Sequence, residues 1–319
     1  MDASYDNTAA LVVLPPASGG RLQDQSIRSW LAKSELQREP RRQELLARIV
    51  SVLGLPYPDE GIAALRMWGQ TGDRPTVWIA AADPVYLEPR LDRLCLHDLG
   101  EASVPPSELR ALFDHLQATL AGEDGAGFVQ LGARGYLRSS VPIATARVPA
   151  YVVDQGAPSQ FLPGGEGTGQ FRNLLSEIEM SLHDHAVNQR RVEAGQRPVN
   201  SLWIWGGGLA PQRSPRPQPR LFANEPELLG YWDSANAVAE LWPGDIEDCI
   251  DASDSGFVAV APHSQDDPDY LSDCLSKLQA ALHAKSFSRL TILFRDGLRA
   301  DIDRSQRLKF WRRDSKLLD

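Results

Sequence analysis

Apolar residues along the chain fall into two patterns, short continuous runs and stripes at helical spacing. The runs at 9–14, 256–261 and 289–294 are almost wholly apolar, as is typical of strands covered on both faces. From Phe171 to Leu182, apolar residues recur at i, i+3, i+4, i+7 and i+11, which predicts an amphipathic helix. Because strands and helices alternate from residue 201 onward, we expect a parallel sheet with helices on both faces.

A second block, residues 75–145, has a different order of elements. Apolar runs towards its two ends predict strands, and apolar spacing at 107–120 predicts one helix between them. The order strand, strand, helix, strand, strand indicates a small α+β unit. Upstream, residues 25–53 have helical spacing with one interruption. We therefore expect an α/β core domain, residues 1–74 and 146–319, with an α+β insert subdomain at 75–145.

The apolar run at 201–205 leads into three glycines, Gly206, Gly207 and Gly208, and then a Pro-rich basic loop. We expect this strand at the centre of the parallel sheet, where loops at the carboxyl ends of strands hold ligands. Glycines let the backbone approach a ligand, and arginines such as Arg213 can grip phosphate or carboxylate. The alternative is an extended surface loop with solvated arginines.

Charge and cysteine content narrow the classes of partner. The 319 residues carry 33 basic and 42 acidic side chains, a net charge of −9, which argues against binding nucleic acid. Three widely spaced cysteines, Cys95, Cys249 and Cys274, fit a reducing compartment. The first residues lack the basic character of a secretory signal, and no run approaches the ~20 apolar residues of a membrane span. We expect a cytoplasmic protein that binds no membrane.

Two groups of residues suggest a metal ion. His183 and His185 are two apart near a predicted helix end, and we expect His185 to continue the apolar face after Leu182 while His183 points away. Residues so spaced point about 200° apart, so we expect them not to share an ion. His263, Asp266 and Asp267 follow a predicted strand and are spaced to hold a divalent cation. A solvated loop that caps the next helix is the alternative.

The glycine-rich stretch 163–169 precedes the predicted helix that begins near Phe171. Free N–H groups at a helix N-terminus can cradle phosphate, but no Gly-Lys-Ser/Thr follows, so the stretch is not a P-loop. The alternative is a flexible linker with Thr168 near the helix N-cap.

A spaced motif occupies the segment between the predicted helix and the glycine-rich strand. Its members are His185, Val187, Asn188, Arg191, Gly195, Pro198, Asn200, Leu202, Gly206 and Gly208. The motif resembles one of the archaeal-type cofactor-independent phosphoglycerate mutases, metalloenzymes of the alkaline phosphatase superfamily. Earlier pieces are similar, in order, to that family's inserted substrate domain, namely 82–85, 92–94, 107–108 and 135–138.

The chain is more similar still to a bacterial family labelled phosphoglycerate-mutase-like or RpfE-type regulatory proteins. This resemblance covers most of the chain and includes LPGG at 162–165, VNSLWIWGGG at 199–208 and KFWRR at 309–313. It implies a three-layer α/β/α sandwich of the alkaline phosphatase type with a small α+β insert. The resemblance to the mutases implies ligand-binding residues at Arg138, His185, Asn188, Arg191, Asn200, Gly206 and Gly208, and the glycine-rich basic loop adds Gly207 and Arg213 as candidates.

The chain departs from the mutase pattern where the metals would bind. The mutases carry an Asp-Gly metal site after the first strand, but residues 15–20 here read PPASGG and leave Ser18 as the candidate nucleophile. No Asp-His pair follows residue 185. Two-metal phosphoryl transfer needs several fixed carboxylates and imidazoles, so we expect the two-metal site to be missing.

The resemblance and the departures from it together imply a phosphoglycerate-mutase-like pseudoenzyme with no cofactor. The regulatory role is implied by the family label alone. Its expected partner is an anion, a phosphorylated or carboxylated small molecule, or else a regulatory protein. The alternative is an active metal-dependent mutase or phosphatase that uses Ser18 and a divalent metal on His263, Asp266 and Asp267. A third hypothesis is a protein-interaction module that uses the Pro-rich loop at 211–219.

Overall fold

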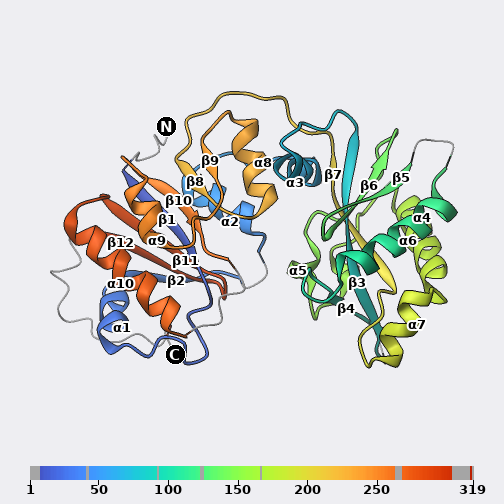
Figure 1. Cartoon of the computed structure of the whole chain (residues 1–319), viewed down its shortest axis with the longest axis horizontal. Coiled ribbons are helices and arrows are strands. Elements are labelled where there is room, and N and C mark those ends of the chain that lie inside the picture. The colour runs from blue at the N-terminus through green and yellow to red at the C-terminus, as the bar shows by residue number, and fades with distance from the viewer. Residues whose placement is uncertain are drawn as a thin grey trace. The chain divides into compact units, whose positions relative to one another are not determined.

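The computed structural model describes residues 8–40, 43–91, 93–122, 126–165, 167–262, 268–303 and 317. The chain divides into two compact units (Figure 1). Unit 1 takes in Met1–Pro56 and Arg213–Asp319, and unit 2 is the continuous stretch Tyr57–Gln212. In the described part of the chain, no helix is both long enough and apolar enough to cross a membrane.

Unit 1 contains a sheet and the helices around it. Its strands are β1 (Ala9–Leu14), β2 (Glu35–Arg38), β8 (Arg220–Phe222), β9 (Ala239–Glu240), β10 (Phe257–Val260), β11 (Arg289–Phe294) and β12 (Leu298–Asp303). Its helices are α1 (Gln25–Ala32), α2 (Leu45–Leu53), α8 (Pro226–Ser234), α9 (Ile246–Asp251) and α10 (Pro268–Ala284).

The described strands of unit 1 are ordered β2-β12-β11-β1-β10-β8-β9. Strand β1 lies between β10 and β11 and is parallel to both, with Val12 opposite Ala259 on one side and Ile292 on the other. Strands β8 and β9 extend the parallel part, whereas β12 and β2 form an antiparallel edge. The predicted α/β class, with a largely parallel sheet, is confirmed.

Helices α1, α9 and α10 cover one face of this sheet (Figure 1). They contribute buried side chains to one core with the strands, among them Trp30, Leu31, Ile246, Leu275, Leu278, Val12, Phe257 and Ile292. Leu11, Val13 and Val258 alternate with these strand residues and are equally buried. Because side chains alternate between the two faces of a strand, both faces of the sheet are covered.

Unit 2 contains a second sheet. Its strands are β3 (Trp78–Pro89), β4 (Leu94–Asp98), β5 (Gly127–Leu131), β6 (Arg134–Ser139) and β7 (Ser201–Gly208). Its helices are α3 (Ile62–Thr71), α4 (Pro106–Leu120), α5 (Ala150–Val153), the 3-10 turn η1 (Pro158–Gln160), α6 (Thr168–His183) and α7 (Ala186–Glu193). The predicted order of strand, strand, helix, strand, strand is confirmed in β3 to β6.

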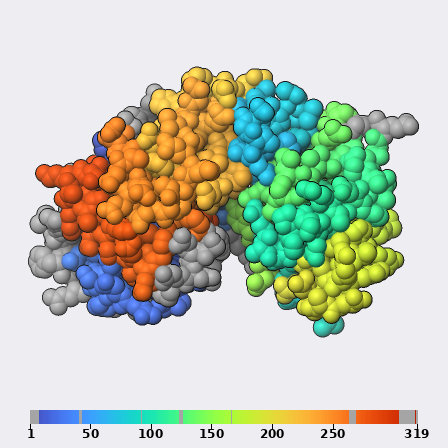
Figure 2. Space-filling model, viewed as in Figure 1, coloured from blue at the N-terminus to red at the C-terminus, as the bar shows by residue number. Residues whose placement is uncertain are grey.

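The long strand β3 organises the sheet of unit 2, whose described strands pair antiparallel. Its first half pairs with β6 and its second half with β4, while β7 pairs along the middle of β3. One face packs on α4 and α6 through Ala80, Ala82, Leu137, Ile204, Leu112, Phe113, Phe171 and Ile178. In Figure 2, the surface of α4 (green) adjoins that of α6 and α7 (yellow). On the other face, Asp83, Tyr136 and Trp205 meet Arg66 of α3.

Two predictions about helices are wrong. Residues 25–53 were expected to be helical with a single interruption. Instead, strand β2 lies between α1 and α2 and pairs with β12. Strand β2 is a mostly exposed edge strand, so it has no apolar alternation to reveal it. His185 does not continue the apolar face of α6, because that helix ends at His183 and His185 is the N-cap of α7.

The position predicted for β7 is also wrong. The strand does not lie in the parallel sheet but pairs antiparallel with β3 in unit 2. The sequence of β7 is continuously apolar because both faces of the strand are covered. A central strand of a parallel sheet has the same pattern, so the sequence could not distinguish the two positions. Trp203 and Trp205 are buried. The expected insert, 75–145, lies within unit 2, which runs further on both sides.

Candidate functional site

The carboxyl ends of four parallel strands meet at one edge of the unit 1 sheet. We call this edge, formed by the residues that directly follow β1, β8, β10 and β11, the carboxyl edge. Ligands of open α/β sheets bind at such edges because loops and helix ends present polar groups there. The carboxyl edge is therefore the first place to look for function in unit 1.

Ser18 lies at the carboxyl edge, in the loop that begins where Pro15 and Pro16 end β1. Its side chain is partly buried, and its backbone N–H donates to Oδ2 of Asp296 at 2.9 Å. The other oxygen of Asp296 accepts the N–H of Leu298 at 3.3 Å. The Asp296 carboxylate thus ties the Ser18 loop to the turn after β11.

Arg295 is a cation at the carboxyl edge. Its Nη2 donates to Oε1 of Glu225 at 2.7 Å and to the carbonyl of Ala261 at 2.8 Å. Burial raises the pKa of Glu225, and the charge and hydrogen bond of Arg295 oppose that rise. Among the described residues, no hydrogen-bond partner is found for Nε of Arg295 or Oε2 of Glu225. Both atoms are buried, so the pair leaves one donor and one acceptor without a partner among the described residues.

A buried polar network occupies the unit 2 sheet. Arg66 of α3 donates from Nη1 to Asp83 at 2.7 Å and from Nη2 to the carbonyl of Gly135 at 2.8 Å. The other oxygen of Asp83 accepts the indole N–H of Trp205. The guanidinium also lies 4.7 Å from the ring centroid of Tyr136, a cation–π distance. The network fastens α3 to the sheet.

Asp98 at the end of β4 has a perturbed carboxyl group. Burial, followed by the nearby carboxylates of Asp83 and Asp154, raises the pKa of Asp98 to about 7. Asp154 also accepts the backbone N–H of Asp98 at 3.0 Å. A carboxyl group that titrates near neutral pH can exchange protons under physiological conditions, as general acids and bases do.

The residues of the mutase-like motif are held in packing contacts. Asn188 donates to the carbonyls of Leu182 and Val199, both at 2.8 Å, and accepts the N–H of Val199 at 2.9 Å. Arg191 bonds Glu108 at 2.7 Å. These buried contacts join α7 to α4, α6 and the start of β7.

The other end of the motif lies far along β7. Asn200, just before the strand, accepts the N–H of Leu87 at 2.7 Å and donates to its carbonyl at 2.9 Å, as a paired backbone would. Gly206, Gly207 and Gly208 lie at the far end of β7. A strand rises about 3.3 Å per residue, so six residues span about 20 Å. The structure does not bring Asn200 and the glycines together.

The remaining predicted ligand residues are dispersed. His185 accepts the N–H of Val187 on Nδ1 at 3.2 Å, and Arg138 on β6 is exposed. Arg213, also exposed, pairs with Asp233 at 2.9 Å in unit 1. Thr168 donates to the carbonyls of Pro163 and Gly165, while Gly167 is the N-cap of α6.

His263, Asp266 and Asp267, the predicted metal ligands, lie outside the described residues. Within the described ranges, one group of at least three side chains is arranged to hold a metal ion, and it lies in unit 2: Glu88, Cys95 and His97. Sequence reasoning missed this group, although Cys95-x-His97 on a strand was a signal, because alternate residues share a face. Arg295 and Glu225 of the carboxyl edge were also missed, and no sequence pattern links these two residues.

Comparison with known proteins gives the chain distant relatives. No model of a protein family matches it. Over 122 residues it is 30% identical to the 2,3-bisphosphoglycerate-independent phosphoglycerate mutase of Methanosarcina barkeri. The matched stretch covers 38% of this chain and 31% of that protein. Over 130 residues it is 28% identical to a probable enzyme of the same name from Geobacter sulfurreducens, covering 40% and 32%.

The chain is a distant homologue of these mutases. The matched stretches span about a third of the length of these curated relatives. The solved cofactor-independent phosphoglycerate mutase of Thermoplasma acidophilum aligns over 93% of this chain and 90% of that one, with a TM-score of 0.43 and 17% identity. The resemblance of the sequence to the mutases is thus confirmed as distant homology, on the sequence matches alone.

Proposed function

We propose that this phosphoglycerate-mutase-like protein binds a phosphorylated or carboxylated small molecule at the carboxyl edge of unit 1, without two-metal catalysis. A regulatory role of the RpfE type, exerted without a cofactor, is part of the same proposal. The distant homology supports a ligand of this class, because the relatives are named for an acidic phosphorylated substrate.

The observation that carries the proposal is the position of Arg295. Its side chain is mostly buried at the carboxyl edge, and among described residues Nε has no hydrogen-bond partner. A guanidinium donates well to carboxylate and phosphate oxygens, and more strongly where water is excluded. The neighbouring Ser18 N–H already holds one carboxylate, that of Asp296. Because that donor is occupied, Arg295 is the group that favours an anionic ligand.

The composition of the loop after β1 argues against two-metal catalysis. Residues 15–20 contain no carboxylate or imidazole, and the nearby charges are already in use. Glu225 is paired with Arg295, and Asp296 is bound to the backbone of Ser18. Metal-assisted phosphoryl transfer needs carboxylates that are free to hold the ions.

Calorimetry and an activity assay on the purified chain test the proposal. We expect 3-phosphoglycerate to bind without being converted to 2-phosphoglycerate when manganese, magnesium or zinc is supplied. Arg295→Lys, which keeps the charge but loses the Nε donor, should weaken binding about tenfold or more. Arg299→Lys on the antiparallel strand β12 is the matched control and should bind normally. Turnover by the pure protein, or equal binding by both variants, would refute the proposal.

A second candidate function is an active mutase or phosphatase. It is favoured by the place of Ser18, which follows the central strand β1 at the carboxyl edge, where a nucleophile would lie. This function requires metal ligands such as His263, Asp266 and Asp267. If it holds, turnover should depend on added divalent metal and be lost in Ser18→Ala.

A further inference from the structure

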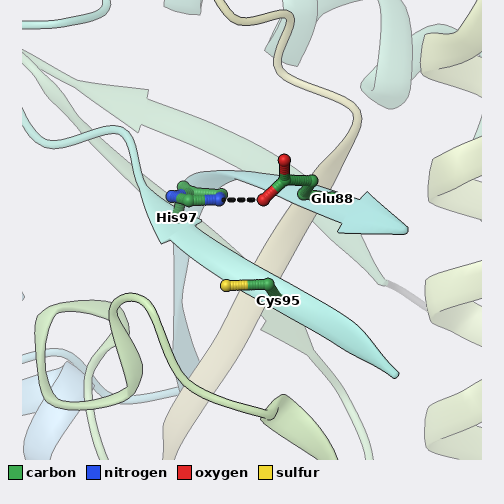
Figure 3. A group of neighbouring side chains, drawn as sticks. All are labelled: Glu88, Cys95 and His97. Atoms are coloured by element: carbon green, nitrogen blue, oxygen red, sulfur yellow. Dashed lines mark hydrogen bonds and ion pairs between the residues drawn. The ribbon is translucent and has the colours of Figure 1, made fainter. Parts of the chain in front are cut away.

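Three side chains capable of binding a metal converge on one face of the β3–β4 pair. The antiparallel register sets Glu88 directly opposite Cys95, and Tyr86 opposite His97. Directly opposed residues point to the same face, and so do residues two apart on one strand. Glu88, Cys95 and His97 therefore share a face, and one ligand atom from each lies within 4.8 Å of the others (Figure 3).

We propose that Glu88, Cys95 and His97 form a mononuclear Zn²⁺ site whose fourth ligand is a water molecule. Thiolate, imidazole and carboxylate are the three side-chain ligands that zinc uses in proteins. A hard ion such as Mg²⁺ takes oxygen ligands instead and would not select a cysteine. Three protein ligands with one open position form the pattern of zinc sites that hold an exchangeable water.

The distances suit an ion after a small adjustment. Bonds of about 2.0–2.3 Å in a tetrahedron set the ligand atoms about 3.3–3.6 Å apart. Nε2 of His97 and Oε2 of Glu88 are 2.9 Å apart, so they need only open slightly. The remaining atoms lie within 4.8 Å of one another, so they need to close by at most about 1.2 Å. Side-chain rotation on fixed strands is enough for both movements.

The surroundings hold two ligands firmly and leave access to the third. Cys95 is 3% exposed and His97 5%, and Tyr86 stacks on the His97 ring with centroids 5.9 Å apart. The Glu88 side chain is 38% exposed, which gives an ion and its water a way in. Arg90, which bonds the same Glu88 oxygen at 3.0 Å, is itself half exposed and can turn aside.

A simpler explanation of the cluster is a hydrogen bond between His97 and Glu88, with Cys95 packed beside it as a small apolar residue. It makes the opposite prediction for metal binding. A zinc site requires the thiol to lose its proton and His97 to free Nε2, so binding would release protons. Packing alone requires neither. The two explanations are therefore separable by titration with metal.

The test uses the full-length chain after chelator treatment and dialysis. We expect calorimetry to show that the wild-type chain binds one equivalent of Zn²⁺ and that this binding requires Cys95. Binding should also release protons. Cobalt should give a thiolate-to-metal charge-transfer band at the same stoichiometry. Cys95→Ser should abolish this band, and His97→Gln and Glu88→Gln should each weaken binding at least tenfold. Because Glu88 is partly exposed, Glu88→Gln can be made with little risk to folding.

Matched controls separate this site from others in the chain. Cys249→Ser removes another buried free cysteine, and His263→Gln removes a predicted ligand of unit 1. Both should keep the cobalt–thiolate band. Absence of the band in the wild-type protein, or its persistence in Cys95→Ser, would overturn the proposal. The result is independent of the proposed function, since it is read from metal binding and not from phosphoglycerate.

Discussion

At the scale of single residues, charge burial distinguishes structural arginines from surface ones. The Arg66 side chain is 3% exposed and is paired with Asp83, whereas that of Arg213 is 51% exposed and is paired with Asp233. Removing one member of a buried pair leaves the other charge uncompensated and costs about 3–5 kcal/mol. An exposed pair contributes at most about 1 kcal/mol.

We therefore expect Arg66→Met to lower the free energy of unfolding by about 3–5 kcal/mol, because it strands the Asp83 carboxylate and the Gly135 carbonyl. Arg213→Met, the control, should cost less than about 1 kcal/mol. Urea unfolding followed by tryptophan fluorescence measures both. Equal losses in the two variants would show that the Arg66 network does not hold α3 on the sheet.

Asp98 makes stability depend on pH. Its folded pKa is about 7, whereas an aspartate in an unfolded chain titrates near ~4. Between these values the folded protein keeps a proton that the unfolded chain loses. The stability from this group is thus fully present below pH ~4 and is lost as the pH rises through about 7.

Asp98→Asn, which is neutral at every pH, should remove this loss. The variant should exceed the wild type in stability by roughly 1–3 kcal/mol more at pH 8 than at pH 5. Urea midpoints at the two pH values give the comparison, with Asp233→Asn at a partly exposed site as the control. A gain that does not vary with pH would contradict a raised pKa at Asp98.

The same scale shows what a sequence can reveal about a site. The spaced motif predicted Asn188 and Arg191 as ligand-binding residues, and in the structure both side chains make hydrogen bonds between elements. Residue type and spacing cannot distinguish a buried donor that meets a carbonyl from one that meets a ligand. Glu225 and Arg295 lie in separate segments and become a pair only when β8, β10 and β11 align.

At the scale of elements, periodicity predicted what forms but not always what it pairs with. Strand β1 and helix α6 appear where the apolar pattern placed them. Strand β7 was expected in the wrong sheet, because its partner β3 is distant in sequence and a doubly covered strand has the same pattern in either sheet. The three glycines at the end of β7 lie where neighbouring residues of unit 2 pack closely against the strand.

Gly207 is a position where packing demands a glycine. A Cβ built there lies 2.4 Å from Cζ2 of Trp78 and 3.0 Å from Oγ1 of Thr145. Gly207→Ala should therefore destabilise the protein by about 1–3 kcal/mol through overpacking. Gly169→Ala in the first turn of α6 meets nothing within 4 Å and should stabilise it by about 0.4–1 kcal/mol. Thermal unfolding of the pair decides the matter, and a neutral Gly207→Ala would contradict the packing role.

At the scale of the whole molecule, the two units differ in how the chain builds them. Unit 1 needs two separate segments, because β1 and β2 come from the first and the other strands from the second. Unit 2 is continuous and has a core of its own. The sequence predicted a shorter insert because nothing local shows that β7 returns to pair with β3.

We expect residues 57–212 to fold when expressed alone, since β3 keeps all three partner strands and α4 and α6 keep their shared core. Residues 75–145 should fail to fold, because losing α6 and β7 exposes one side of that core and one edge of β3. Dispersed amide signals and a cooperative thermal transition, present for the longer fragment and absent for the shorter, would be the expected result. A folded 75–145 fragment would instead mean that β7 and α6 add to a unit already complete without them.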